Sequence, residues 1–269
     1  MRLINFLLFC YLIFVTLNLT ARDKVRSEKF EKYFAAYHVD GCFVLYDLEK
    51  DQFILSNPER CKRGFLPAST FKIFNSLTAL ETGVVSGKDF RIKWDGTDHS
   101  NPEWNHDQTL ESAFKVSAVW YYQEIARRIG EERMQYWLNL AVYGNKNPDG
   151  GIDQFWLKGA IRITPVEQTL FLAKLVRESL PFSKVNQKIV KEMMLEKDLK
   201  GYLFGAKTCW AILPDKTNLG WFVGYILKDG KWYTFATNIE SKSQMTGFPQ
   251  IRRDVTWEIL RELGLDSEQ

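Results

Sequence analysis

The apolar and polar positions of this chain predict a helix, two strands, a long helical block, three more strands and a last helix. Apolar residues at helical spacing predict a helix over 25–37, and β-rich runs predict strands over 41–46 and 52–55. The residues between these strands, 48–51, predict a hairpin turn. We expect the block that follows, roughly 64–201, to be largely helical.

Capping residues and glycines mark helix boundaries in the central block. Thr164, Pro165 and Glu167 predict a helix start, with Thr as N-cap, Pro in the first turn and Glu completing a capping box. Glycines close two of the expected helices, after 119–129 and 134–142. The other helices expected in the block span 69–81, 110–115 and 183–195.

Strand patterns return in the last third of the chain, over 208–213, 220–227 and 232–238. Asp229–Gly230 between the last two predicts a hairpin, and a helix is expected over 250–263. Together the five strands predict one antiparallel sheet, flanked by the terminal helices, in an α/β (α+β) fold. The helical block would form a second lobe, with a site between the two.

Composition indicates a globular chain with one large domain. Of 269 residues, 45% are hydrophobic and 26% charged. We expect a mature domain over 22–269, with a sheet lobe from 22–63 and 202–269 and a helical lobe from 64–201. The net charge of +3 is near balance and no run of Lys and Arg stands out, so nucleic-acid binding has no support.

The N-terminus has the pattern of a secretory signal peptide. Arg2 precedes a run over 3–17 that carries no charge, and charge returns at Arg22. We expect cleavage near Ala21, a periplasmic mature protein and no stable membrane association. The alternative, a retained anchor, would be short of the ~20 apolar residues that a membrane span needs.

Cysteine and histidine usage offers no metal site. Cys42, Cys61 and Cys209 would remain after cleavage, and whether Cys42 and Cys61 pair is left open. The chain contains no C-x-x-C, no H-E-x-x-H and no G-x-S-x-G, so we expect neither a bound metal nor an α/β-hydrolase site.

The strongest candidate for chemistry is the segment 67–77. A helix starting here would bring Ser69 and Lys72 onto one face, with the Ser69 hydroxyl near free backbone N–H groups. A hydroxyl becomes a nucleophile when a base stands beside it. The alternative is an N-cap serine followed by a solvated lysine, but the apolar neighbours, Phe71 and Phe74 among them, leave little polar surface for Lys72.

Further motifs follow in order: Ser117–Ala118–Val119, Tyr143–Gly144–Asn145, Phe155–Trp156–Leu157, Lys207–Thr208, Trp221–Phe222–Val223–Gly224 and Arg252. Each is weak alone, but their joint occurrence is specific. With Ser69–Thr70–Phe71–Lys72, they resemble the motifs of the class D, oxacillinase-type serine β-lactamases over nearly the whole predicted mature chain. The resemblance implies the serine β-lactamase and penicillin-binding transpeptidase fold, and hydrolysis of β-lactam antibiotics that confers resistance.

The resemblance also implies roles for the catalytic residues. Ser69 would attack the lactam carbonyl, and Lys72 would carry a carbamate made from CO2 or bicarbonate (N6-carboxylysine) as general base. Val119 and Trp156 would help to bury Lys72, and the Trp156 N–H would bond the carbamate. Ser117 and Lys207 would deliver a proton to the leaving nitrogen. Taken alone, Trp156 could be an ordinary core tryptophan, Ser117 a helix cap and Lys207 a solvated lysine.

For substrate binding, the resemblance implies Thr208 and Arg252 as partners of the substrate carboxylate, with neighbouring Arg253 as the alternative to Arg252. The backbone N–H groups of Ser69 and Trp210 would form the oxyanion hole. Tyr143–Gly144–Asn145 would have a supporting role.

One residue departs from the family pattern. The third motif usually ends in glycine, and here the residue is Cys209. Its thiol would either crowd the substrate groove or point to the other face of the sheet. Three other functions stay open: a β-lactam sensor domain that keeps the acyl adduct, a penicillin-binding peptidase, and an inactive binding protein. Monomer and homodimer also stay open.

Overall fold

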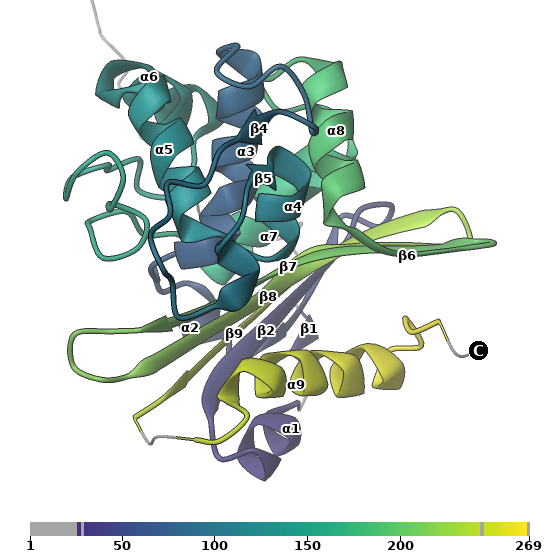
Figure 1. Ribbon diagram of the computed structural model, residues 1–269. Coiled ribbons are helices and arrows are strands. Elements are labelled where there is room, and N and C mark those ends of the chain that lie inside the picture. Colours follow the sequence, from purple (N-terminus) through teal and green to yellow (C-terminus); the bar gives the residue numbers. More distant parts are fainter. Residues whose placement is uncertain (1–25, 28–29, 243–244, 268–269) are drawn as a thin grey trace, which may run out of the picture.

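The structure is a computed structural model, and it describes residues 26–27, 30–242 and 245–267. The expected signal peptide lies outside these residues. A seven-stranded sheet crosses the described part of the chain, with helices on both of its faces (Figure 1). In order across the sheet, the strands are β1 (Arg26–Ser27), β3 (Gln52–Ser56), β2 (Asp40–Asp47), β9 (Lys231–Ser241), β8 (Asn218–Lys228), β7 (Tyr202–Ile212) and β6 (Leu195–Leu199).

Two helices cover one face of this sheet and the remaining elements lie on the other (Figure 1). The first layer is α1 (Glu31–Ala36) and α9 (Phe248–Glu262). The second layer comprises α2 (Pro58–Cys61), α3 (Phe71–Glu81), α4 (Leu110–Lys115), α5 (Val119–Ile129), α6 (Glu131–Ala141), α7 (Pro165–Val176), α8 (Lys184–Met194) and a small ribbon of β4 (Arg91–Ile92) and β5 (Gln108–Thr109).

Each face of the sheet has its own apolar core. The core under α1 and α9 contains Phe43, Phe222 and Phe235, and the core under the helical layer contains Val44, Trp221 and much of α3. Neighbouring residues of a strand point to opposite faces, so one strand supplies both cores. The α/β sheet-and-helix architecture expected from the sequence is confirmed.

Helix α3 is buried on every side. All ten residues from Phe71 to Leu80 are buried, Lys72 among them. A helix buried on every side lies in the interior, and its polar side chains need partners there. The chain therefore places α3, with the Ser69–Lys72 pair at its start, between the sheet and the outer helices.

Local signals from the sequence are confirmed where they depend on near neighbours. Thr164 and Glu167 form the predicted capping box, with Pro165 in the first turn of α7. Asp229 and Gly230 have φ of 50° and 77°, as a tight hairpin turn between β8 and β9 requires. Helix α6 ends at Ala141, because Val142 adopts a left-handed φ of 52°.

The prediction needs correction at three places along the seven-stranded sheet. Strand β6 was not predicted, since its residues are mostly exposed and lack alternation, and it forms by pairing with β7. Strand β7 starts at Tyr202 and not at Thr208. The predicted helix over 25–37 is shorter, because residues 26–27 pair in parallel with β3 and α1 begins at Glu31. The sheet is therefore antiparallel except at this edge.

Cys42 and Cys61, whose pairing the sequence left open, are buried free thiols in the helical-layer core. A hydrogen bond to Cys42, together with burial, raises the pKa of the Cys61 thiol. Among the described residues, no helix has the length and apolar character that crossing a membrane requires.

Candidate active site

Ser69 and Lys72 lie side by side at the start of α3. Ser69 belongs to a short 3-10 helix, Ala68–Thr70, that leads directly into α3. Lys72 Nζ donates a hydrogen bond of 3.0 Å to Ser69 Oγ. Ser69 is not an N-cap, because the cap positions of this short helix and of α3 are Pro67 and Thr70. The hydroxyl therefore has an amine as its partner, as the i, i+3 spacing predicts.

Lys72 is a fully buried amine in aromatic surroundings. Its side chain is 0% exposed, and Nζ lies 5.2 Å from the centre of the Tyr122 ring. No ion pair to an acidic side chain is formed by Lys72 in the described part of the chain. Burial lowers the pKa of Lys72 from 10.5 to about 8. Near neutral pH, this lysine is therefore far more often unprotonated than a solvated one.

Trp156 packs beside the same helix. Its ring stacks on Phe71 with centroids 5.4 Å apart and planes at 18°, and its backbone oxygen accepts a 2.9 Å hydrogen bond from Ala68 N–H. The indole Nε1 is buried, with no hydrogen-bond partner among the described residues. A buried donor without a partner is costly, so Nε1 is suited to bonding an acceptor that enters this pocket.

Ser117 and Lys207 meet across the boundary between the helical layer and the sheet. Ser117 lies in the turn between α4 and α5, and Lys207 Nζ on β7 donates a 2.5 Å hydrogen bond to Ser117 Oγ. The structure excludes the two alternatives, a Ser117 helix cap and a solvated Lys207. Ser117 makes no helix cap, because the residue preceding α5 is Ala118, and Lys207 is buried.

Two buried lysines lie close enough to influence each other. Burial, followed by the positive charge of Lys72, lowers the pKa of Lys207 to about 7. Protonating either amine makes protonation of the other less favourable. The two hydroxyls, Ser69 and Ser117, thus each have an amine partner that can gain or lose a proton near neutral pH.

Backbone strain marks two positions beside these hydroxyls. Ala68, directly before Ser69, has a φ of 42°, and Ser117 itself has a φ of 59°. Residues with a side chain seldom adopt such left-handed values, and they cluster at functional sites. This strain supports Ser69 and Ser117 as the functional hydroxyls.

The two neighbouring arginines on α9 differ in their partners. Arg253 forms two hydrogen bonds to Glu196, of 3.0 and 2.9 Å. Arg252 is buried, and its Nε and Nη1 have no hydrogen-bond partner among the described residues. Burial lowers the pKa of Arg252 to about 10, which still leaves it charged at neutral pH. Its free donors make Arg252 the better candidate for an anionic ligand.

Strand β7 presents a free edge to the nucleophile. From Ala206 onward β7 pairs only with β8, because its pairing with β6 stops at Gly205. Strand β7 also packs against the short 3-10 helix Ala68–Thr70 that carries Ser69. Thr208 is half-buried on this segment. Trp210 is 50% exposed, and its Nε1 bonds Asn218 Oδ1 at 3.0 Å.

The thiol of Cys209 lies on the same face of β7 as Lys207, within the helical-layer core and only 1% exposed. Burial raises the pKa of the Cys209 thiol, and the backbone N–H of Ser69 acts on it in the opposite direction. The thiol therefore points toward the helical layer and not to the far face of the sheet, and it is too buried to line an open groove. Strand alternation between 207 and 209 was the signal available for this placement.

Sequence reasoning also missed Tyr122. This residue falls on the buried side of α5, its ring faces Lys72, and its hydroxyl shares a 2.8 Å hydrogen bond with Ser76. Helical spacing from Val119, the half-buried first residue of α5, places Tyr122 one turn further on. That spacing was the available signal.

Comparison with known proteins gives one consistent result. A family model for the penicillin-binding protein transpeptidase domain matches residues 41–256. The probable β-lactamase YbxI of Bacillus subtilis (strain 168) is 42% identical over 226 residues, which are 84% of this chain and 82% of the relative. β-lactamase OXA-10 of Pseudomonas aeruginosa is 38% identical over 261 residues, which are 95% of this chain and 97% of the relative.

The structural comparison agrees. The crystal structure of the class D β-lactamase YbXI from Nostoc is 40% identical, with a TM-score of 0.84 over 88% of this chain and 99% of that one. The fold and site thus define a penicillin-recognising serine enzyme. More specifically, the chain belongs to the class D β-lactamases.

The relatives also include a regulatory protein. The regulatory protein BlaR1 of Bacillus licheniformis is 32% identical over 223 residues, which are 83% of this chain but only 37% of that protein. This chain therefore matches most of the length of the named β-lactamases but little more than a third of this regulator.

Proposed function

We propose that the protein hydrolyses β-lactam antibiotics through an acyl-enzyme on Ser69, and that it thereby confers β-lactam resistance. The observation that carries the proposal is the 3.0 Å hydrogen bond between Ser69 Oγ and a buried Lys72 amine whose pKa is lowered to about 8. A hydroxyl next to an unprotonated base can lose its proton as it attacks a carbonyl.

The surroundings of Lys72 fit a carbamate formed from CO2. The amine is buried and lacks an acidic partner among the described residues, and Trp156 Nε1 is a buried donor that lacks an acceptor. A carbamate on Lys72 Nζ supplies a negatively charged general base beside Ser69. Trp156 holds it through its indole N–H, while the aromatic surroundings keep bulk water away.

Ser69 Oγ attacks the lactam carbonyl, and the ring C–N bond opens. Lys207 and Ser117, joined by their 2.5 Å hydrogen bond, pass a proton to the ring nitrogen as it leaves. The backbone N–H groups of Ser69 and Trp210 stabilise the oxyanion at the free edge of β7. Water then attacks the acyl group and releases it from Ser69.

Arg252 and Thr208 bind the carboxylate that most β-lactams carry. Arg252 offers two buried nitrogen atoms without partners among the described residues, whereas Arg253 already has Glu196 as its partner. A planar guanidinium bonds a carboxylate through two parallel hydrogen bonds. We further propose that the N-terminal segment directs export to the periplasm, where β-lactams act.

Hydrolysis of a chromogenic cephalosporin tests the proposal. We expect the wild type to turn over many equivalents, and Ser69→Ala to neither hydrolyse the substrate nor become labelled by penicillin in mass spectrometry. A single equivalent consumed, with a lasting adduct on Ser69, would identify a sensor or a penicillin-binding peptidase instead. Binding without any adduct would identify an inactive binding protein.

A further inference from the structure

The segment that carries Trp156 is a compact turn. Within residues 149–160, which we name the Trp156 turn, Ala160 N–H bonds Asp149 O at 2.8 Å and Phe155 N–H bonds Gly151 O at 2.9 Å. A Cβ added to Gly159 would lie 2.4 Å from Asp149 O, so the two ends of the turn touch. The contacts that fasten this closed turn to the rest of the protein therefore decide where its side chains lie.

The inner side of the turn faces the start of α3. Trp156 stacks on Phe71, and its backbone oxygen accepts a hydrogen bond from Ala68, the residue before the nucleophile. Asn145 fastens the C-terminal end, because its Nδ2 bonds Ala160 O at 2.9 Å. These contacts leave the N-terminal half of the turn to be fastened elsewhere.

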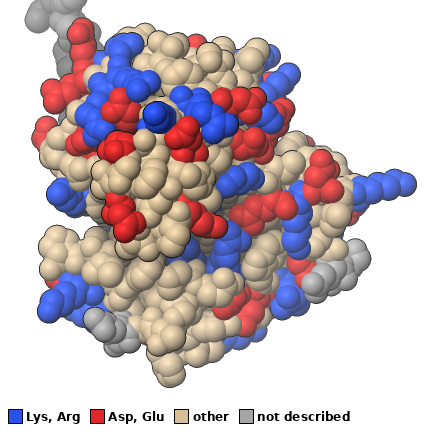
Figure 2. Space-filling view, in the orientation of Figure 1, with Lys and Arg blue, Asp and Glu red and all other residues tan. Residues whose placement is uncertain are grey.

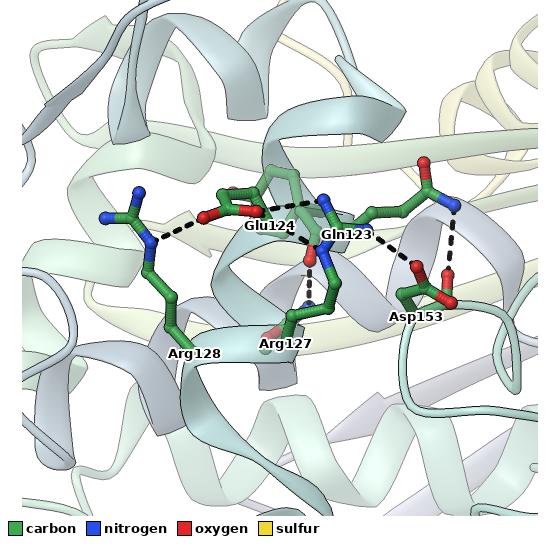
Figure 3. A network of polar contacts seen from close by, with 7 residues as sticks. Gln123, Glu124, Arg127, Arg128 and Asp153 are labelled. Carbon is green, nitrogen blue, oxygen red and sulfur yellow. Dashed lines mark hydrogen bonds and ion pairs between the residues drawn. The ribbon is translucent and has the colours of Figure 1, made fainter.

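That half is fastened to α5 by a polar network (Figure 3). Arg127 Nη1 bonds Asp153 Oδ2 at 2.6 Å, and Gln123 Nε2 bonds the Asp153 backbone oxygen at 3.1 Å. Glu124 lies between Arg127 and Arg128 and bonds both, and its bond to Arg127 Nη2 orients the Arg127 guanidinium toward Asp153. Figure 2 shows that acidic and basic side chains are also intermixed on the surface of the helical layer.

Helix α5 is also part of the active site. It begins two residues after Ser117, and its Tyr122 ring faces Lys72. Tyr122 is fixed to α3, because its backbone oxygen accepts a hydrogen bond from Asn75 and its hydroxyl bonds Ser76. A turn fastened to α5 is therefore held relative to both Lys72 and Ser117.

We propose that Arg127 and Asp153 are positioning residues that clamp the Trp156 turn to α5 and so hold the Trp156 indole where it retains a carbamate on Lys72. The inference rests on the carbamate part of the proposed function. In forming the carbamate, the neutral Lys72 amine adds to the carbon of CO2. An N–C bond forms, one C=O π bond breaks with its electron pair moving to oxygen, and one N–H bond breaks as a proton leaves to solvent.

The size of the effect follows from exposure. Arg127 is 48% exposed and Asp153 27%, and a partly exposed ion pair contributes little, although a network contributes more than a single pair. Loss of the clamp should therefore raise the bicarbonate concentration needed for half-maximal carbamate by roughly three- to fivefold. Activity at saturating bicarbonate should change little.

The test is a titration of purified full-length protein with ¹³C-bicarbonate, followed by the carbamate signal in ¹³C NMR. Arg127→Gln and Asp153→Asn should each raise the bicarbonate midpoint roughly three- to fivefold, and the double variant should raise it no further, because both remove one interaction. The bicarbonate midpoint of Arg127→Lys, which keeps the charge, should lie between those of the wild type and Arg127→Gln. Arg128→Gln is the matched control. It removes the same charge from the same helix, and the described contact of that side chain is with Glu124 and not with the turn.

An unchanged midpoint in Arg127→Gln and Asp153→Asn would overturn the clamp, and so would an equal shift in Arg128→Gln. A smaller signal at an unchanged midpoint, together with a lower urea unfolding midpoint, would also overturn it, since that indicates loss of folded protein only. If the wild type gives no carbamate signal at any bicarbonate concentration, the lysine chemistry of the proposed function fails. If the wild type gives a normal carbamate signal and the variants have the same bicarbonate midpoint as the wild type, only the clamp is refuted and the lysine chemistry stands.

Discussion

Lys207 Nζ and Ser117 Oγ are joined by a 2.5 Å hydrogen bond although they are 90 positions apart in the sequence. The bond links β7 to the turn between α4 and α5, where Ser117 has a left-handed φ of 59°. Burial and the charge of Lys72 lower the pKa of Lys207 to about 7. This pair can therefore hold or release a proton at neutral pH, beside a nucleophile with an amine partner of its own.

Ser117→Ala should slow turnover by roughly 10²- to 10⁴-fold and leave the unfolding midpoint nearly unchanged, because one proton-transfer group is lost. Lys207→Ala should have a similar effect on turnover. Steady-state kinetics with a chromogenic cephalosporin measures both. If the two residues act as one relay, the double variant is no slower than the worse single variant. If the rate losses of the two single variants multiply in the double variant, the two residues do not act in a shared step.

Arg252→Ala should raise KM for substrates with the usual carboxylate by roughly tenfold or more, with a smaller change in kcat, because a charge-assisted hydrogen bond is lost. Arg253→Ala is the matched control. It lies next to Arg252 and carries the same charge, but its guanidinium already bonds Glu196. A larger KM effect in Arg253→Ala would show that the assignment is one residue off.

Cys209 should resist alkylation in the folded protein, because its thiol is 1% exposed and burial raises its pKa. Iodoacetamide labelling with peptide mass spectrometry, in the presence and absence of urea, measures this. Labelling of Cys209 without urea at the rate found in urea would place the thiol in the open groove.

Cys209→Gly should speed acylation by about tenfold, since it removes a buried thiol near the Ser69 N–H, which is a proposed oxyanion donor. Cys209→Ser keeps a polar side chain of similar size and serves as the control. Stopped-flow kinetics measures the acylation rate of the wild type and of both variants. Equal rates in wild type and Cys209→Gly would mean that the thiol does not compete for this donor.

Features that depend on near neighbours could be predicted from the sequence. Ser69 and Lys72 are one helical turn apart, so a helix start was enough to bring them together. The Thr164 capping box and the Asp229–Gly230 turn depend on two to four residues each. For the same reason, the sequence predicts the sheet's central strands and the α/β architecture.

Features that depend on distant partners could not be predicted from local sequence patterns, and the joint role of Ser117 and Lys207 came only from the family resemblance. Strand β6 has a polar, exposed sequence and exists because β7 pairs with it. The choice between Arg252 and Arg253 rests on Glu196, which is 57 residues away from Arg253. Likewise, the partner of Asp153 is Arg127 on another element, and each is by itself an ordinary surface charge.

Activity should depend on pH and bicarbonate together, because CO2 adds only to the neutral form of Lys72. Burial lowers the pKa of Lys72 to about 8, so about one amine in ten is neutral at pH 7, against fewer than one in a thousand for a solvated lysine. Protonation increases as pH falls below 8 and draws the carbamate back to ammonium and CO2. Activity in degassed buffer should therefore fall between pH 8 and 6.

Added bicarbonate should restore this lost activity, and Trp156→Ala should need more of it, because that variant loses the indole donor and opens the pocket to water. Initial rates across the pH range, with and without bicarbonate, measure both effects. Lys72→Ala should remain acylated, and mass spectrometry would show the adduct on Ser69. Rates that ignore bicarbonate at pH 6, in wild type and Trp156→Ala alike, would leave the neutral amine of Lys72 as the base.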